Sequence, residues 1–443
     1  MSGSDYFIRL AAFIFISATL IGVIVSPTAG RKAIERAGAA ASYLELPAAN
    51  GKACAFAQPP LAGPFADIED VLSISPLGGV TAPGETLPAP YIRINTKRGE
   101  TAFARRSTAA LSPAKTDIVA IERIIERSPK GRAANTSWIV HFRPCESISF
   151  YYGRLDTISD DILSRAGGLR AFTELGGPDH LAVETNIRVQ KGEFIGQADG
   201  FDIGLHDANA APAQFEAPER YAANPFPRAA VFNAAPSLID AISPKTPQAR
   251  CPIDYLPGAL RESWSAKLGD SWGIRKARGE NACRTAIADA PGAARGVWFT
   301  DAAHNAAASR VSAVALSPDT IDPDRLIFAL HGRLSSLTPE MIALPPLMDQ
   351  EKAEATKDFL SFRKGDGRIN PAFDNVRDNQ IYCFEGLRTN FVGPQINGVI
   401  LLQRKSAANG PAILKMEARA DARSCIDLAD PWAFTGRETM FYR

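Results

Sequence analysis

The 443-residue chain lacks the sequence signals that mark several common enzyme classes. It contains no Gly-x-Ser-x-Gly nucleophile elbow, no Walker loop and no Gly-x-Gly-x-x-Gly, so neither a serine hydrolase nor a nucleotide enzyme is supported. Its formal net charge is only +1, which gives no electrostatic footprint for nucleic acid. Internal repeats are not evident either. Clues to function therefore have to come from local patterns.

Histidine is scarce, and no two histidines have the i, i+4 spacing of a helical metal site. The five are His141, His180, His206, His304 and His331. His141 lies in the apolar run Ile-Val-His-Phe, which predicts a structural histidine on the face of a strand. We expect structural roles for the histidines. His206 is the strongest candidate for a catalytic role, because it lies where the resemblance described below places metal ligands.

Cysteine is also infrequent, and the Cys-x-x-Cys spacing of zinc fingers and redox motifs is missing. Six cysteines permit 15 pairings. Proximity along the chain favours Cys54 with Cys145, Cys251 with Cys283, and Cys383 with Cys425. Such bridges persist only in an oxidising compartment. The alternative is six unrelated buried thiols.

Only one long hydrophobic run occurs, from Leu10 to Val25, with Arg9 before it and Ser26-Pro27 after it. We interpret residues 1–29 as an uncleaved signal anchor, with a cleaved signal peptide as the alternative. Basic residues follow the run in excess, at Arg31, Lys32 and Arg36, which favours a cytoplasmic body. Long domains translocate largely regardless of charge, so the cysteines decide. We expect an inner-membrane anchor and a periplasmic body.

Strand signals dominate the rest of the chain, which predicts a mainly β protein. An Ala-rich, Pro-interrupted linker spans 30–66, and a first β domain spans 67–210. Its strands are expected at Tyr91–Asn95, Ile118–Ile125, Ser137–Arg143, Ile148–Tyr152 and Phe201–His206, with a helix within Ser159–Phe172. Lys191-Gly192 predicts a tight turn that joins two strands as a hairpin.

A connecting region with short helices is expected at 211–300, and a C-terminal antiparallel β domain at 301–443. The helices are expected at Ser237–Ile242 and Gly258–Leu268. The strands of the last domain are expected at Ala313–Leu316, Leu326–Leu330, Gln380–Phe384, Gly398–Gln403 and Ala412–Ala418, with a helical insertion at Pro339–Arg363.

Two segments carry a resemblance to a known family. One runs from Tyr151 (Tyr-Tyr-Gly-Arg-Leu-Asp) through Val189-Gln-Lys-Gly-Glu-Phe-Ile-Gly-Gln-Ala-Asp-Gly200 to Asp207, and the other is Pro76 to Ile92. Between Leu77 and Asp207 the chain resembles the β-barrel core of lysostaphin-type zinc endopeptidases, the duplicated hybrid motif barrel. Those enzymes cleave peptidoglycan peptides with a zinc ion held by histidines and an acid.

The metal-binding residues of that family are replaced here. Glu85 and Tyr91 stand where the family has histidine, and Pro90 stands in place of the acid. Arg154 replaces the histidine of the Tyr-x-His-Leu strand, and a guanidinium offers no lone pair to a metal. The His-x-His strand has become Asp202-Ile-Gly204 or, one step along, Gly204-Leu-His206.

The resemblance therefore implies a degenerate site formed by Glu85, Tyr91, Arg154, Asp202 and His206, without catalytic residues or cofactor. Catalytic zinc takes three protein ligands, and Glu85, Asp202 and His206 are the only candidates. We expect Arg154 to form an ion pair with Glu85 or Asp202 across the old cavity.

Three functions follow from these expectations. The first is a membrane-anchored periplasmic protein, not an enzyme, that binds peptidoglycan or a partner protein of the cell envelope. The second is a metallopeptidase with an atypical metal site. The third is a periplasmic adaptor of an export system, although the long heptad hairpins of that class are absent. A lipoyl-type carrier is disfavoured because no lysine occurs between Gly192 and Asp207.

Overall fold

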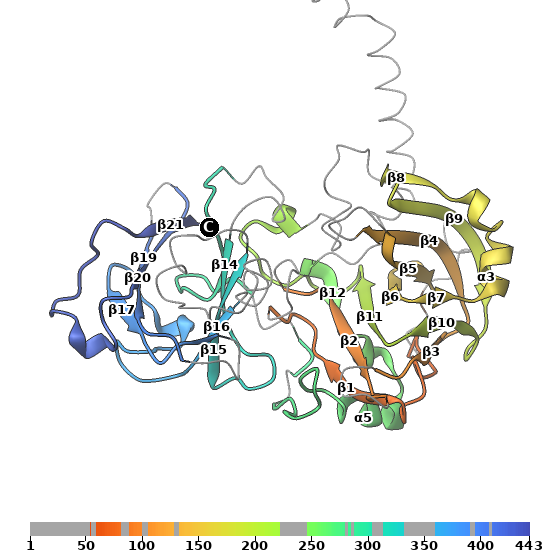
Figure 1. Cartoon of the computed structure of the whole chain (residues 1–443), viewed down its shortest axis with the longest axis horizontal. Helices are drawn as coiled ribbons and strands as arrows, with labels where there is room; N and C mark the ends of the chain where they lie inside the picture. The colour runs from red at the N-terminus through yellow and green to blue at the C-terminus, as the bar shows by residue number, and fades with distance from the viewer. Residues whose placement is uncertain are drawn as a thin grey trace, which may run out of the picture.

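The computed structural model describes residues 54, 59–80, 88–99, 105–127, 133–221, 246–279, 282–284, 288–303, 313–331, 359–389, 395–406 and 410–443. These residues confirm a mainly β protein with antiparallel sheets. Figure 1 shows two halves, one built from β1 to β12 with α3 and α5, and the other from β13 to β21. The expected segments Leu10–Val25 and Ser237–Ile242 lie outside the described residues. No helix within the described ranges is long and apolar enough to cross a membrane.

A large sheet forms the centre of the N-terminal half. Its strands lie in the order β1 (Val71–Ser75), β2 (Tyr91–Thr96), β11 (Gly200–Asp207), β6 (Ile148–Leu155), β5 (Ala133–Arg143), β4 (Thr116–Arg127), β9 (His180–Val189) and β8 (Thr173–Gly177), with β12 (Ala249–Arg250) paired to β11. All neighbouring strands are antiparallel. The strands expected from the sequence between Tyr91 and His206 are all present.

A second, smaller sheet covers one face of the large one. It consists of β3 (Thr108–Leu111), β10 (Phe194–Ala198) and β7 (Thr157–Ile158), followed along the chain from β7 by α3 (Asp160–Arg165) and the 3-10 turn η1 (Leu169–Ala171). Alternation along β11 places Phe201, Ile203 and Leu205 in the shared core, as predicted. The opposite face of β11 carries Asp202 and Gly204.

The turn at Lys191-Gly192 is present, but the hairpin prediction is wrong. Gly192 has φ 81°, a conformation that suits glycine. The strand before the turn, β9, pairs with β4 and β8, whereas β10 pairs with β3 and β7. The turn therefore carries the chain from one sheet to the other. Strands on both sides are apolar because they face one core, and a local pattern does not distinguish this from a hairpin.

The segment after β11 contributes short helices to the N-terminal half. It contains η2 (Pro218–Tyr221), η4 (Thr246–Gln248), η5 (Pro252–Tyr255) and α5 (Gly258–Ser265). Trp264 of α5 is fully buried and meets Phe65 edge to face, with 4.9 Å between ring centroids. Phe65 and Leu61, which the sequence places in the linker, are also buried in this core.

A single antiparallel sheet forms the C-terminal half. Its order is β17 (Ile381–Phe384), β19 (Val399–Lys405), β20 (Ile413–Arg419), β21 (Thr439–Tyr442), β13 (Gly296–Phe299), β14 (Ala313–Pro318), β15 (Arg325–His331), β16 (Phe359–Arg363) and β18 (Arg388–Thr389), with η7 (Phe373–Asn375) and η8 (Cys425–Asp427) outside it. Phe359–Arg363 is a buried strand, so the end of the expected helix Pro339–Arg363 is wrong. Leu360 and Phe362 pack in one buried cluster and Phe359 in another, so the apolar residues follow the two-residue period of a strand.

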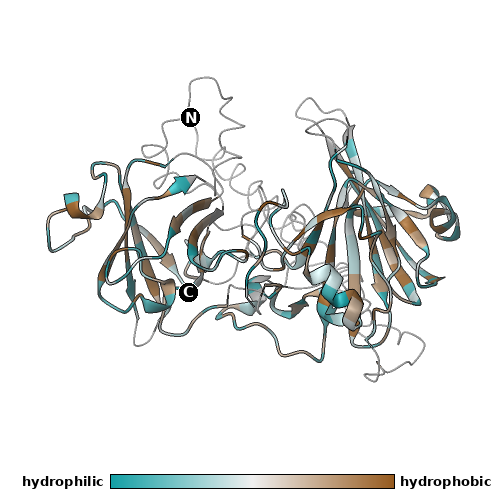
Figure 2. Cartoon of the chain, turned by 90° about the horizontal axis from the view of Figure 1, so that it is seen from below, coloured by the Kyte–Doolittle hydropathy of each residue, from teal (hydrophilic) through white to brown (hydrophobic). Residues whose placement is uncertain are grey.

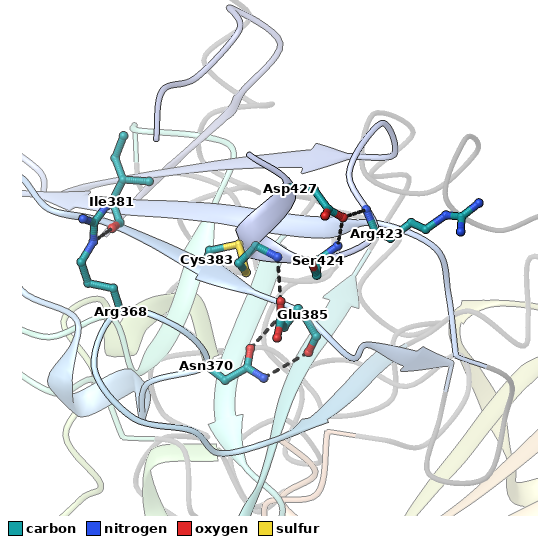
Figure 3. Close-up of a disulfide and its surroundings, with 9 residues drawn as sticks. Arg368, Asn370, Ile381, Cys383, Glu385, Arg423, Ser424 and Asp427 are labelled. Carbon is teal, nitrogen blue, oxygen red and sulfur yellow. Dashed lines mark hydrogen bonds between the residues drawn. A yellow bond between two sulfur atoms is a disulfide. The ribbon is translucent and has the colours of Figure 1, made fainter. Parts of the chain in front are cut away.

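All three expected disulfides are present. Cys54 pairs with Cys145, Cys251 with Cys283, and Cys383 with Cys425, with Cα–Cα distances of 5.1, 5.7 and 5.9 Å. Figure 3 shows that the last bridge ties β17 to η8, where a carboxylate oxygen of Glu385 accepts the N–H of Cys425 at 2.6 Å. These bridges indicate an oxidising compartment, either extracellular or periplasmic.

The two halves share a small apolar interface. Phe215, from the segment after β11, packs among Val297, Phe299 and other buried residues of the C-terminal sheet. Val80, from the loop after β1, joins the same cluster. In Figure 2 hydrophobic residues recur along the strands of both halves. Arg275 of the first half also pairs with the buried Asp319 of the second at 2.8 Å.

Arg443 anchors several segments at one edge of this interface. Its guanidinium donates to the carbonyls of Arg295, Ala290 and Ala293, and lies 3.2 Å from a carboxylate oxygen of Glu216. It also stacks over the Trp298 ring at 4.2 Å. The side chain is almost fully buried, so every one of these contacts replaces water.

We predict that Arg443→Ala lowers the free energy of unfolding by about 3 kcal/mol. The buried carbonyls would lose their hydrogen-bond donor, and the buried carboxylate of Asp289 would lose its nearby cation. Urea titration of the full chain measures this. The exposed Arg423 provides the control, and Arg423→Ala should change stability by less than about 0.5 kcal/mol. Equal effects of the two substitutions would contradict the anchoring role.

Candidate functional site

The face of the large sheet that points away from the small sheet carries an unusual set of polar groups. We call it the polar face. Residues facing it lie on six adjacent strands, in the order β2, β11, β6, β5, β4 and β9. They are Tyr91 and Arg93 on β2, Asp202 and Gly204 on β11, Tyr151 on β6, His141 on β5, Glu122 on β4, and His180 on β9.

Strand register places four of these residues in one row across the sheet. Tyr91 is opposite Gly204, Gly204 is opposite Tyr151, and Tyr151 is opposite His141. The rings of His141 and Tyr151 are 5.9 Å apart between centroids. A Cβ on Gly204 would overlap the Tyr151 ring, so the ring lies directly over this glycine. The glycine therefore makes room for the tyrosine within the row.

One end of the polar face is held by an ion pair. Arg93 Nε donates to one carboxylate oxygen of Asp202 at 2.7 Å, and an Arg93 terminal nitrogen donates to the other at 3.2 Å. This fork arrangement is the strong form of an arginine–carboxylate contact. The side chain of Asp202 is 1% exposed and that of Arg93 is 24% exposed, so the pair is largely shielded from water. The guanidinium also lies over the Tyr91 ring, at 5.6 Å.

The other end carries a carboxylate between two histidines. Glu122 accepts a hydrogen bond from Nε2 of His141 at 2.6 Å and contacts Nε2 of His180 with its second oxygen. All three side chains are buried. Nδ1 of neither ring has a hydrogen-bond partner in the described part of the chain.

Two opposing effects set the acidity of Glu122. Burial by itself raises its pKa, but the hydrogen bonds and electrostatic attraction of His141 and His180 outweigh burial and hold the pKa at about 2. Glu122 is therefore ionised at neutral pH. An isolated buried carboxylate would be very costly, so the two imidazoles are a condition for having an acid at this position.

The structure brings together only part of the site expected from the sequence. Tyr91 and Asp202 lie on adjacent strands of the polar face, whereas Glu85 lies outside the described residues. Arg154 is exposed and has φ 62°, and the partner of Asp202 is Arg93 rather than Arg154. His206 is on the same face as Asp202 but at the end of β11, opposite Ser149.

The described candidates do not fit a zinc ion. Asp202 directs both oxygens at Arg93, and Gly204 has no side chain to offer. Asp202 and His206 are four residues apart on one strand, about 13 Å along it, which is too far for ligands of one metal. No group of three or more His, Cys, Asp or Glu residues in the described ranges is arranged to hold a metal.

Sequence reasoning missed Arg93, Glu122 and His180. A usable signal existed for Glu122, because it is a charged residue in the middle of the apolar run Ile118–Ile125. A buried acid needs a partner, and histidine is rare in this chain. Its two partners come from β5 and from β9, and β9 follows 58 residues later in sequence. Only the strand order places them on either side of β4.

Comparison of the chain with protein-family models, with curated proteins and with solved structures found no match.

The polar face neutralises its buried acids with groups from neighbouring strands. Its acids are held by cations or imidazoles, and Tyr91, His141, Tyr151 and Asp202 are shielded from solvent.

We predict that Glu122→Gln destabilises the protein by about 3 kcal/mol at neutral pH, because the folded-state pKa of about 2 lies below the ordinary 4.5. The folded state binds fewer protons than the unfolded state between these values. The stabilisation is therefore complete above pH 4.5 and is lost as the pH falls toward 2. Urea titrations of both proteins between pH 7 and pH 3 measure the difference.

Glu184 is the matched control, since it is an exposed acid on β9, the same strand as His180. Glu184→Gln should leave stability within about 0.5 kcal/mol of the parent at every pH. A Glu122→Gln effect that stayed constant down to pH 3 would show that the ionised carboxylate is not the source of the stabilisation.

Proposed function

We propose that this chain is a non-catalytic, membrane-anchored protein of the periplasm with a degenerate lysostaphin-type barrel, and that it acts by binding a partner protein of the cell envelope. The observation that carries the proposal is the Arg93–Asp202 pair. It joins β2 and β11, the strands that carry Tyr91, Asp202 and His206 of the site implied by the resemblance.

The charge at this position argues against a restored metal site. A guanidinium is protonated at all physiological pH values and offers no lone pair. A divalent cation could bind Asp202 only if the Arg93 side chain moved off the carboxylate. The positively charged arginine would then lie beside the metal ion. The pair has a good fork geometry and a buried acid, so breaking it is costly.

Burial of the polar face favours a protein partner over a peptidoglycan stem peptide. A peptide held in the old groove would have to contact side chains in the middle of the face. Tyr151, Asp202 and His141 there are almost completely buried, and Tyr91 is nearly so. Binding through outer surfaces, as protein partners do, needs no opening of this face.

The compartment is supported by the three disulfides, and the anchor by the apolar run from Leu10 to Val25. A metallopeptidase with an atypical site would need Glu85, Asp202 and His206 to converge. The spacing of the last two along β11 does not favour this.

We predict that the full chain, titrated with zinc and incubated with peptidoglycan peptides, shows neither stoichiometric binding nor cleavage. His206→Ala should leave the metal content unchanged. Isothermal titration and chromatography of the peptides measure the two outcomes. Stoichiometric zinc together with peptide cleavage would overturn the non-catalytic assignment.

We predict that Asp202→Ala lowers stability by about 3 kcal/mol, because Arg93 then loses its counter-ion in a largely shielded site. The double variant Arg93→Ala, Asp202→Ala should lose less than the sum of the two single variants. A double-mutant cycle in urea unfolding measures the coupling. If the effects of the two single variants were additive, Arg93 and Asp202 would not interact energetically, which would contradict the proposal.

A further inference from the structure

A tight turn after α5 displays two large apolar side chains. The segment is Asp270-Ser-Trp-Gly-Ile-Arg275, which we call the apolar turn. Trp272 is 54% exposed and Ile274 is 79% exposed, although both side chains are large and apolar. Figure 1 shows α5 beside β1 at the lower edge of the N-terminal half, and a backbone bridge joins Leu268, just before the turn, to Ile74 of β1.

The apolar turn is braced rather than loose. The carboxylate of Asp270 accepts the backbone N–H groups of Trp272, Ile274 and Arg275 at 3.1, 2.9 and 3.2 Å. The carbonyl of Asp270 accepts the hydroxyl of Ser73 at 2.6 Å, which ties the turn to β1. The exposed residues are therefore held in place before any partner arrives, so docking costs little ordering entropy.

Arginines surround the apolar turn. The guanidinium of Arg98 lies over the Trp272 ring at 4.3 Å, and Arg105 donates to the carbonyl of Ser271 at 3.2 Å. The pKa of Arg105 is lowered, first by burial and then, against the attraction of Asp199, by repulsion from Arg98 and Arg93. Arg93, Arg98 and Arg105 therefore lie near one another at this edge, with Asp199 beside them. The carboxylate of Asp270 is engaged by the turn itself and by Arg275.

We propose that the apolar turn is a docking point for an anionic lipid surface. Trp272 and Ile274 enter the boundary between headgroups and acyl chains, where tryptophan is favoured. The exposed Arg98 faces the lipid phosphates, and Arg105 holds the turn beside it through the carbonyl of Ser271. A guanidinium stacked on a ring directs its N–H groups outward in its own plane, which suits phosphate oxygens.

The size of the surface decides between a bilayer and a protein as the occupant. A specific protein interface buries about 800 Å² on each partner, far more than two side chains supply. Each basic residue near an anionic membrane contributes about a factor of five in affinity, and each apolar side chain adds to it. A bilayer contact of this size is weak alone, but a tether raises its effective concentration.

The proposal rests on the proposed membrane anchor in one respect, because the tether supplies that effective concentration. Residues 26–53 separate the apolar run from Cys54, the first cysteine of the body. At about 3.3 Å per residue, their covalent length could span up to roughly 90 Å. The tether is therefore long enough to let the apolar turn reach the bilayer.

The test places a fluorescent label at the apolar turn of the full chain. All six cysteines are in disulfides, so Ile274→Cys introduces a single reactive thiol. The labelled protein is reconstituted into vesicles of phosphatidylcholine with 30% phosphatidylglycerol that contain brominated acyl chains. We expect quenching at position 274 at least about fivefold greater than in vesicles of phosphatidylcholine alone.

Ile426, which is 87% exposed on the C-terminal half, gives the matched control. A label at Ile426→Cys should be quenched little in either vesicle, and Trp272→Ala with Arg98→Glu should bring the 274 signal down to that level. Equal quenching at 274 and 426, or a 274 signal that responds to added peptidoglycan sacculi and not to lipid, would overturn the proposal. Neither outcome depends on zinc binding or peptide cleavage, so failure here is distinguishable from failure of the non-catalytic assignment.

Discussion

Ionised side chains on a buried sheet face need partners, and this requirement shapes the N-terminal half. The central strands are covered on both sides, so an acid on either face must be neutralised across the sheet. Asp202 is held by Arg93 from the next strand, and Glu122 by His141 and His180 from the strands on either side. β4 and β11 are separated by two strands, about 14 Å, so these are two independent centres. Each pins the register of the strands that it joins.

The same requirement relates the polar face to the proposed function. A hydrolytic metal site needs acids and imidazoles whose lone pairs point at a common centre. Here the lone pairs of Asp202 point at a guanidinium, and those of Glu122 point at imidazole nitrogens. The donors are used to stabilise the fold.

Much of the fold followed from local pattern. Alternation along Phe201–His206 predicted the core face of β11, and the helix expected at Gly258–Leu268 is present as α5, which ends at Ser265 and buries Trp264. Proximity predicted the three cysteine pairs. Local pattern failed where a strand's partner is distant. The turn at Gly192 joins two sheets instead of forming a hairpin, and Phe359–Arg363 is a strand because β15 and β18 flank it.

The sequence by itself predicted most of the strands and the favoured cysteine pairing, because these depend on residue type and spacing along the chain. Only the tertiary structure decided which charges meet. Arg154 was expected to pair with Glu85, which lies outside the described residues, or with Asp202, yet cross-strand register brings Arg93 to Asp202. Glu122 and His180 are 58 residues apart in the chain and adjacent in the sheet. Strand order depends on how the apolar faces of many distant segments pack together. No single segment of the sequence contains that information.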